Sequence, residues 1–313
     1  MSQHTSEDGL LLPGLDGTNP LGFLAALGLL GCLSRTGQRT SIRLGWTQSH
    51  STWIPRITFD PNAPATQELL LEDLEKILLT NRLEHPANLY QELQTACDSR
   101  REFFEQVLAG ASVHQRLRVD FLAAIASDAT PDDAVSQIQT TRRDYHLGNI
   151  DSILKNTRRE HLQRAVFNPW DYSDSLDNQS LHLDPTEDRR HAYQWNKPSG
   201  DPSRKRSGGV LGANRLAIEA IALLTSFPNK AKLKTLGFQG DRSTNTVWTW
   251  PIWIPSVSIE TVKTLLGLEE LQNEEIDRES RNRLNEYGVA AAYRTQRILV
   301  EKTPNFTPPY RVS

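Results

Sequence analysis

Residues 167–220 read FNPWDYSDSLDNQSLHLDPTEDRRHAYQWNKPSGDPSRKRSGGVLGANRLAIEA, and they join a long polar stretch to an apolar helical pattern. The helical pattern begins after Gly209 and continues to Leu224, with aliphatic side chains at helical spacing between polar ones. A long polar segment that leads into a buried helix is a common location of functional residues. This stretch is therefore the candidate functional centre of the chain.

Residues 13–33, PGLDGTNPLGFLAALGLLGCL, predict a second buried helix. Thr18 or Asn19 suits the N-cap, and Pro20 fits the first helical position, where its missing N–H costs no hydrogen bond. Apolar residues surround the helix on all sides, which indicates burial. Glycines before a helix also occur at phosphate sites, but this stretch matches neither a Walker A loop nor a dinucleotide fingerprint. A buried, capped helix is the favoured interpretation.

Strand patterns occur near both ends of the chain, and helical patterns lie between them. Pro55 and Pro251 fall inside strand patterns, so those strands are predicted to lie at a sheet edge or to carry a bulge. Residues 66–140 place leucines at helical spacing, with polar residues and turn-forming breaks between them. The predicted strands are residues 41–46, 52–59, 232–238, 246–254 and 290–302.

Together these patterns predict an α+β fold, in which a mixed sheet from the N-terminal hairpin and the C-terminal strands packs with a helical insertion. The two buried helices would form the core. Residues 1–65 would supply the N-terminal helix and hairpin, and residues 66–165 the helical region. Residues 166–313 would supply the C-terminal part of the α+β core together with the long polar loop.

Composition limits the classes of partner. The chain has 313 residues, with 35 Lys and Arg against 38 Asp and Glu, a formal net charge of −3. Attraction of the whole protein to nucleic acid is therefore not expected, and any such binding must be local. Cys32 and Cys97 match no metal or redox spacing. The apolar run from Leu21 to Leu33 is shorter than the roughly 20 residues of a membrane span, so we expect a cytoplasmic protein without a membrane partner.

One group of side chains suggests metal chemistry. His182, Asp184, Asp188 and His191 fall within ten residues, and imidazole and carboxylate groups at such spacing could hold a divalent cation. The competing interpretation is a polar hairpin, because Asp184-Pro185-Thr186 is ordinary turn chemistry. The chain has no HExxH, CxxC or GxSxG motif. We expect no metal and no cofactor, with a metal-dependent nuclease or hydrolase as the alternative.

A second group suggests contact with nucleic acid. Basic side chains neutralise phosphates, and aromatic faces stack on unpaired bases. The competing interpretation is that the basic residues are solvated and the tryptophans anchor the core. Asn214, at the start of its helix, would hold the loop or face the ligand. The residues predicted to contact nucleic acid are Trp170, Tyr172, Arg189, Arg190, Trp195, Lys197, Arg204, Lys205, Arg206 and Arg215.

Several long motifs, in the same order along the chain, resemble the type I-G (formerly I-U) CRISPR-associated Cas3-extension family. They are PGLDGTNPLGFLAALGLL, IRLGWTQSHSTWIP, HLQRAVFNPWDYSDSLDNQSLHLDPTEDRRHAYQW, SGDPSRKRSGGVLGANRLAIEA, TWPIW and NFTP. The resemblance covers most of the chain, and residues 66–140 are its least distinctive part. His182 and His191 depart from the family pattern, which has Arg and Tyr there, and this weakens the metal interpretation.

The resemblance implies a non-catalytic subunit or accessory factor of a Cascade-type complex in antiviral CRISPR interference. The implied partners are Cas3 and other type I-G Cas proteins, with crRNA, target DNA or both. The chain lacks Cas3's own Walker A, DExH and HD motifs, so it is not expected to be the helicase or the HD nuclease. A pure protein–protein adaptor is a further alternative.

Overall fold

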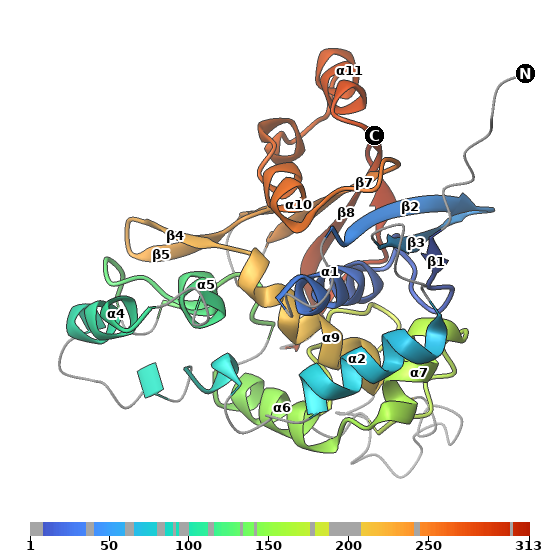
Figure 1. The fold of residues 1–313 in the computed structure, drawn as a ribbon. Helices are drawn as coiled ribbons and strands as arrows, with labels where there is room; N and C mark the ends of the chain where they lie inside the picture. Colours follow the sequence, from blue (N-terminus) through green and yellow to red (C-terminus); the bar gives the residue numbers. More distant parts are fainter. Residues whose placement is uncertain are drawn as a thin grey trace, which may run out of the picture.

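The computed structural model describes residues 9–35, 41–59, 66–79, 85–89, 92–93, 100–111, 116–131, 134–140, 143–175, 179–187, 208–240, 245–300 and 303–313. Two helices lie at its centre, α1 (Pro20–Arg35) and α9 (Leu211–Ala220). The helices α2, α6 and α7 lie on one side of this pair, and the strands β2, β7 and β8 lie on the other together with α10 and α11 (Figure 1). Residues 20–33 of α1 and every residue of α9 are buried. The prediction of two buried helices is therefore confirmed.

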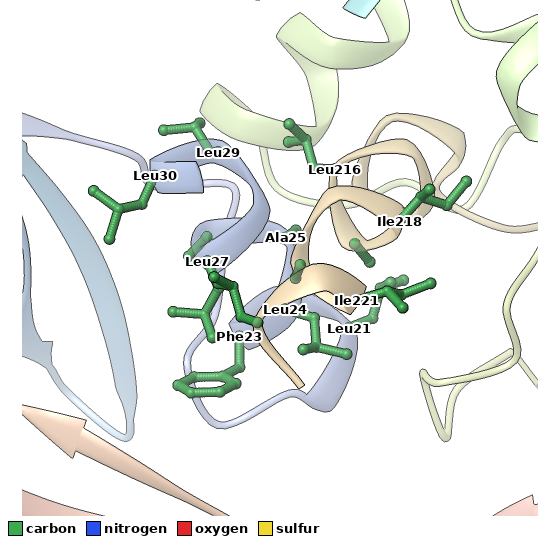
Figure 2. Close-up of a cluster of buried hydrophobic side chains, with 14 of the residues drawn as sticks. Leu21, Phe23, Leu24, Ala25, Leu27, Leu29, Leu30, Leu216, Ile218 and Ile221 are labelled. Atoms are coloured by element: carbon green, nitrogen blue, oxygen red, sulfur yellow. The ribbon is translucent and has the colours of Figure 1, made fainter. Parts of the chain in front are cut away.

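A glycine sets the distance between these two helices. A Cβ atom added at Gly28 of α1 would lie 1.8 Å from the carbonyl oxygen of Leu216 in α9, so no other residue fits there without backbone movement. Aliphatic side chains, among them Leu24, Leu27 and Ile221, fill the space around this contact (Figure 2). Buried helices that approach so closely form a single close-packed core.

The N-terminal hairpin belongs to a three-stranded antiparallel sheet. Its strands are β1 (Leu10–Leu11), β2 (Arg43–Ser49) and β3 (Thr52–Thr58), in the order β1-β3-β2. Pro55 predicted an edge strand or a bulge, yet β3 is the central strand. The fold accommodates this proline because β1 is only two residues long and pairs with Arg56 and Ile57, beyond the position of Pro55.

A five-stranded antiparallel sheet forms the C-terminal part. Its strands are β6 (Phe238–Gln239), β7 (Val247–Trp253), β8 (Val289–Val300), β9 (Thr303–Phe306) and β10 (Tyr310–Arg311). The order is β10-β8-β7-β6, and β9 also pairs with β8. The register of β7 against β8 shifts between Ile252 and Trp253, which places the predicted irregularity next to Pro251.

The α+β class is confirmed, but the described strands do not join into one mixed sheet. The N-terminal and C-terminal strands form separate sheets, and every strand pair in the described ranges is antiparallel. An isolated bridge, Leu44↔Val257, joins β2 to the segment that follows β7. Aromatic rings occupy the space between the two sheets. Trp46 stacks on Phe23 at 5.8 Å between ring centroids and meets Trp253 edge-on at 5.9 Å. These rings pack elements of both sheets and of α1 against one another.

Helices fill the middle of the chain, as its periodicity predicts. Helices α2 and α7 pack against each other and against the α1–α9 pair. The sequence pattern over residues 149–167 predicts one helix, but the chain breaks it at Arg158, whose backbone is extended, so α6 and α7 are separate. The helices are α2 (Gln67–Leu79), α4 (Arg100–Ala109), α5 (Arg116–Ile125), α6 (Arg143–Asn156) and α7 (Arg159–Phe167), with the 3₁₀ turn η2 (Pro86–Asn88).

The remaining elements flank the C-terminal sheet. A two-stranded hairpin, β4 (Ser226–Asn229) and β5 (Lys232–Thr235), extends outward above α4 and α5 (Figure 1). The 3₁₀ turn η5 (Ile221–Leu223) follows α9, and α10 (Ile259–Leu266), η6 (Glu269–Gln272) and α11 (Arg278–Glu286) connect β7 to β8. None of the described helices is long and apolar enough to cross a membrane.

Replacement of Gly28 tests the α1–α9 contact. Gly28→Ala should destabilise the protein by about 2 kcal/mol or more in urea unfolding, because the added methyl group overlaps the Leu216 carbonyl. Gly148→Ala in α6 is the matched control, since a Cβ there meets no atom within 4 Å. The control should be neutral or stabilising by up to about 1 kcal/mol, as expected for alanine in place of a helical glycine. Equal unfolding midpoints for the two variants would contradict the proposed close contact.

Candidate functional site

The polar stretch that the sequence singles out is anchored at both of its ends. The described chain stops at Glu187 and resumes at Gly208. The Gly208 N–H donates to the Tyr172 carbonyl at 2.8 Å, and the Gly209 N–H donates to the Asp174 carbonyl at 2.8 Å. On the other side, the Glu187 carboxyl accepts the Val210 N–H at 3.3 Å. The two residues that flank 188–207, Glu187 and Gly208, are therefore held in the same region of the fold.

Three acidic residues, Asp174, Asp184 and Glu187, lie in the region where these flanking residues meet. We call them the acidic junction. Asp184 is buried, and its Oδ1 accepts from the Asn19 side-chain amide at 3.0 Å and from the Thr186 N–H at 2.8 Å. Its Oδ2 accepts from the Tyr172 hydroxyl at 2.9 Å. All of these partners are donors, so the Asp184 carboxylate is well compensated in its buried position.

Asn19 connects Asp184 to the first turn of α1. Its side-chain oxygen accepts the N–H groups of Leu21 at 2.8 Å and Gly22 at 3.2 Å, which is the geometry of an N-cap. The predicted choice between Thr18 and Asn19 is thus settled in favour of Asn19. Because the same amide also donates to Asp184, the cap of α1 and the acidic junction form one hydrogen-bonded unit.

Glu187 and Asp174 connect the acidic junction to the first turn of α9. The N–H groups of Val210 and Leu211, at the start of this helix, donate to Glu187 Oε1 and, at 2.8 Å, to Asp174 Oδ2. Asn214 donates to Glu187 Oε1 at 3.2 Å and accepts the Leu181 N–H at 2.7 Å. Acidic groups at a helix N-terminus satisfy its free N–H groups and complement its dipole.

Burial and a neighbouring charge determine the protonation of Glu187. Burial raises the pKa of Glu187 to about 8, and the negative charge of Asp184 adds to this effect. At neutral pH Glu187 therefore carries a proton, although the hydrogen bond that it accepts from the Ser180 hydroxyl acts in the opposite direction and lowers its pKa. Burial and the charge of Asp184 also raise the pKa of Tyr172, which keeps its phenol protonated as the donor to Asp184.

Trp170 and Tyr172, predicted to contact nucleic acid, brace this region. Both are partly buried against the core, and their rings meet edge to face at 6.2 Å and 83°. The Trp170 indole N–H donates to the Ala165 carbonyl at 3.0 Å. Tyr172 has a left-handed backbone with φ of 51°, which turns the chain where it meets Gly208. Of the two roles that the sequence suggested for these rings, their contacts favour bracing over stacking.

Arg215, also predicted to contact nucleic acid, lies in the core instead. It is 1% exposed, donates to Glu219 Oε1 at 2.7 Å and reaches the Leu78 carbonyl at 3.3 Å. The reason is that α9 is buried on all sides, so a side chain one turn from its start cannot reach the surface. The spacing of Arg215 and Glu219, four residues apart in a helix, is the sequence signal that indicates this ion pair.

The other predicted contact residues lie outside the described residues. They are Arg189, Arg190, Trp195, Lys197, Arg204, Lys205 and Arg206, and the same holds for Asp188 and His191 of the metal hypothesis. His182 lies 3.4 Å from the Asn149 amide through its Nε2, and Asp184 is occupied as described above. Within the described ranges, no group of three His, Cys, Asp or Glu residues could hold a metal ion.

Glu219 centres a second buried cluster, which sequence reasoning missed. Besides Arg215, it accepts from Arg35 at the end of α1 and from His85 Nε2 at 2.6 Å. Burial alone would raise the pKa of Glu219, but His85, Arg215 and Arg35 together hold it well below its usual value. His85 Nδ1 accepts the Ala87 N–H at 3.0 Å, so Nε2 carries the proton that faces Glu219, and burial lowers the pKa of His85.

Cys32 lies beside this cluster on α1. Burial raises the pKa of its thiol to about 12, and the nearby charge of Glu219 adds to this. A thiol with such a pKa is protonated at neutral pH and is a poor nucleophile. The cluster therefore has the character of a structural ion network, with a neutral thiol packed next to it.

Comparison of the chain with protein-family models and with curated proteins finds no match.

The protonation of Glu187 is testable through the pH dependence of stability. The carboxyl has a pKa of about 8 in the folded protein against 4.5 for an ordinary glutamate, so the folded state holds the extra proton between these values. Stability should therefore fall as pH rises through this window, by about 2 kcal/mol between pH 6 and pH 8, and level off above pH 8. Glu187→Gln should remove this decrease.

Urea unfolding of both proteins between pH 5.5 and pH 9 measures the effect. Other titrating groups act in both proteins, so the difference between the two curves isolates Glu187. The variant should match the wild type near pH 5.5 and exceed its stability at pH 8. Parallel curves would show that Glu187 is ionised in the folded state.

Proposed function

We propose that this protein is a non-catalytic subunit or accessory factor of type I-G CRISPR interference, and that it contacts nucleic acid through residues 188–207. The observation that carries the proposal is the anchoring of both ends of this segment on the acidic junction. The junction is in turn joined to the first turns of the two most buried helices, α1 and α9. A recognition segment held on such a base is positioned by the rigid part of the fold.

The charge of the segment indicates the kind of ligand. Residues 188–207 contain six Lys and Arg and two Asp, a net charge of +4 in a protein whose net charge is −3. Tyr193 and Trp195 lie between the basic residues in the sequence. Cations interspersed with aromatic rings suit a phosphate backbone with accessible bases.

Fixing both ends of the segment also favours binding energetically. Closing a loop of this length costs conformational entropy. Folding brings the two ends of the segment together, so ligand binding does not add this cost. Less ordering then remains to be done on binding, which raises affinity for a given set of contacts. The acidic junction acts as a positioning frame in this proposal, and the basic residues supply the contacts.

The resemblance to the type I-G family supports a role in CRISPR interference. The residues of the junction and its partners, from Asn19 through Tyr172 and Glu187 to Asn214, all fall inside the motifs that carry this resemblance. The proposed partners are Cas3 and other type I-G Cas proteins, together with crRNA or target DNA in a Cascade-type effector. Co-purification with the neighbouring Cas proteins, with and without crRNA, tests this setting.

Charge reversal in the segment tests nucleic-acid binding. Arg204→Glu/Arg206→Glu should weaken binding to fluorescently labelled single-stranded DNA, duplex DNA or crRNA at least 10-fold, because two phosphate contacts become repulsive. Titrations between 50 and 200 mM salt should also show a shallower salt dependence, by about 1.4 in the logarithmic slope on a single strand. Arg278→Glu/Arg281→Glu on the exposed face of α11 makes the same charge change elsewhere and should have little effect.

Two other outcomes would replace the proposal. Capture of Cas proteins by a chain that binds none of the three nucleic acids would indicate an adaptor. Cleavage that requires Mg²⁺ or Mn²⁺ and disappears in Asp184→Asn, with an unchanged melting temperature, would indicate a nuclease.

A further inference from the structure

The β4–β5 hairpin carries a second surface suited to nucleic acid. It forms a two-stranded sheet of its own, with Ser226 opposite Thr235, Phe227 opposite Lys234, and Asn229 opposite Lys232. Successive pairs in an antiparallel ladder face opposite sides. The pair of Phe227 and Lys234 therefore shares one face with the pair of Asn229 and Lys232.

The opposite face fixes the hairpin to the body of the protein. The Ser226 hydroxyl donates to the Ala124 carbonyl of α5 at 2.7 Å and lies 3.0 Å from the Thr235 hydroxyl. Gln137 makes two further bonds with Thr235, through its backbone N–H at 2.8 Å and its side-chain oxygen at 3.0 Å. Leu233 is buried on the same face. The base of the hairpin is thus bonded to the body of the protein, and Phe227, Asn229 and Lys232 on its other face are exposed.

The outward face combines one aromatic ring with cations. Phe227 is 51% exposed, and the strand opposite it carries Lys232 and Lys234. Lys230 is exposed in the turn. Lys234, opposite Phe227 in the ladder, donates to the Gly240 carbonyl at 2.6 Å. Residues 225–240 contain these three lysines and no acidic residue, whereas the chain as a whole is acidic.

We propose that this hairpin binds a single strand of nucleic acid, with the Phe227 ring stacked on an unpaired base and Lys230 and Lys232 on the adjoining phosphates. An exposed aromatic ring flanked by cations matches the alternation of base and phosphate in a single strand. An apolar protein partner would have to desolvate the lysines, which disfavours it. The described part of the molecule carries this site without residues 188–207.

Three variants test the hairpin, each measured by fluorescence anisotropy with a labelled 20-nucleotide oligo(dT) between 50 and 200 mM salt. Phe227→Ala should weaken binding about 10-fold at each salt concentration, and Phe227→Trp should restore it, because stacking needs an aromatic face. Lys230→Glu/Lys232→Glu should weaken binding and reduce the logarithmic salt slope by about 1.4.

Matched controls separate this effect from general surface changes. Leu108→Ala removes a side chain of similar exposure from α4, 54% against 51%, and should leave affinity unchanged. Arg278→Glu/Arg281→Glu repeats the charge reversal on α11 and should also have little effect. Wild-type affinity in Phe227→Ala, weakening of duplex binding alone, or absence of binding by the wild type would overturn the inference.

Parallel titration of Arg204→Glu/Arg206→Glu distinguishes this inference from the proposed function. Loss of affinity in the hairpin variants alone would support the hairpin and count against residues 188–207 as the contact. Loss in the Arg204→Glu/Arg206→Glu protein alone would do the reverse. Loss in both sets supports two contact points on one strand.

Discussion

The close approach of α1 and α9 at Gly28 is the constraint on which the rest of the structure depends. With a backbone carbonyl in the place of a side chain, the two helices pack as one unit that is buried on all sides. A buried helix pair leaves its end groups without water. Its free N–H and carbonyl groups must then find partners within the protein, since an unpaired buried polar group is costly.

The acidic junction and the Glu219 cluster supply such partners at opposite ends of the α1–α9 pair. The acidic junction holds the N-terminal ends of both helices, through Asn19 on α1 and through Val210 and Leu211 on α9. Arg35, at the end of α1, meets Glu219 in the last turn of α9, so the helices run in the same direction. Parallel dipoles repel each other, and Asp174 at the N-terminus of α9 together with Arg35 at the C-terminus of α1 offsets part of this repulsion.

The α1–α9 core positions both the residues that flank 188–207 and the base of the β4–β5 hairpin. Residues 188–207 leave from and return to the acidic junction, whose geometry follows from the capping of α1 and α9. The hairpin of β4 and β5 follows α9 directly through η5, and its base is bonded to α5. Residues 188–207 carry a net charge of +4, and residues 225–240 carry three lysines and no acidic residue, in a chain whose net charge is −3.

The sequence alone determined the features that depend on local pattern. It indicated both buried helices, the cap before Pro20, the hairpin of β2 and β3 and the α+β class, because apolar spacing and turn residues act over a few positions. Tertiary structure decided the rest. The sequence indicated a buried helix but not that its polar positions are covered too, so Arg215 was predicted to reach a ligand, whereas it is 1% exposed. Phe23 and Trp253, more than 200 residues apart, pack their rings edge to face. The meeting of Asn19, Asp184 and Asn214 likewise results from long-range packing, which no local spacing encodes.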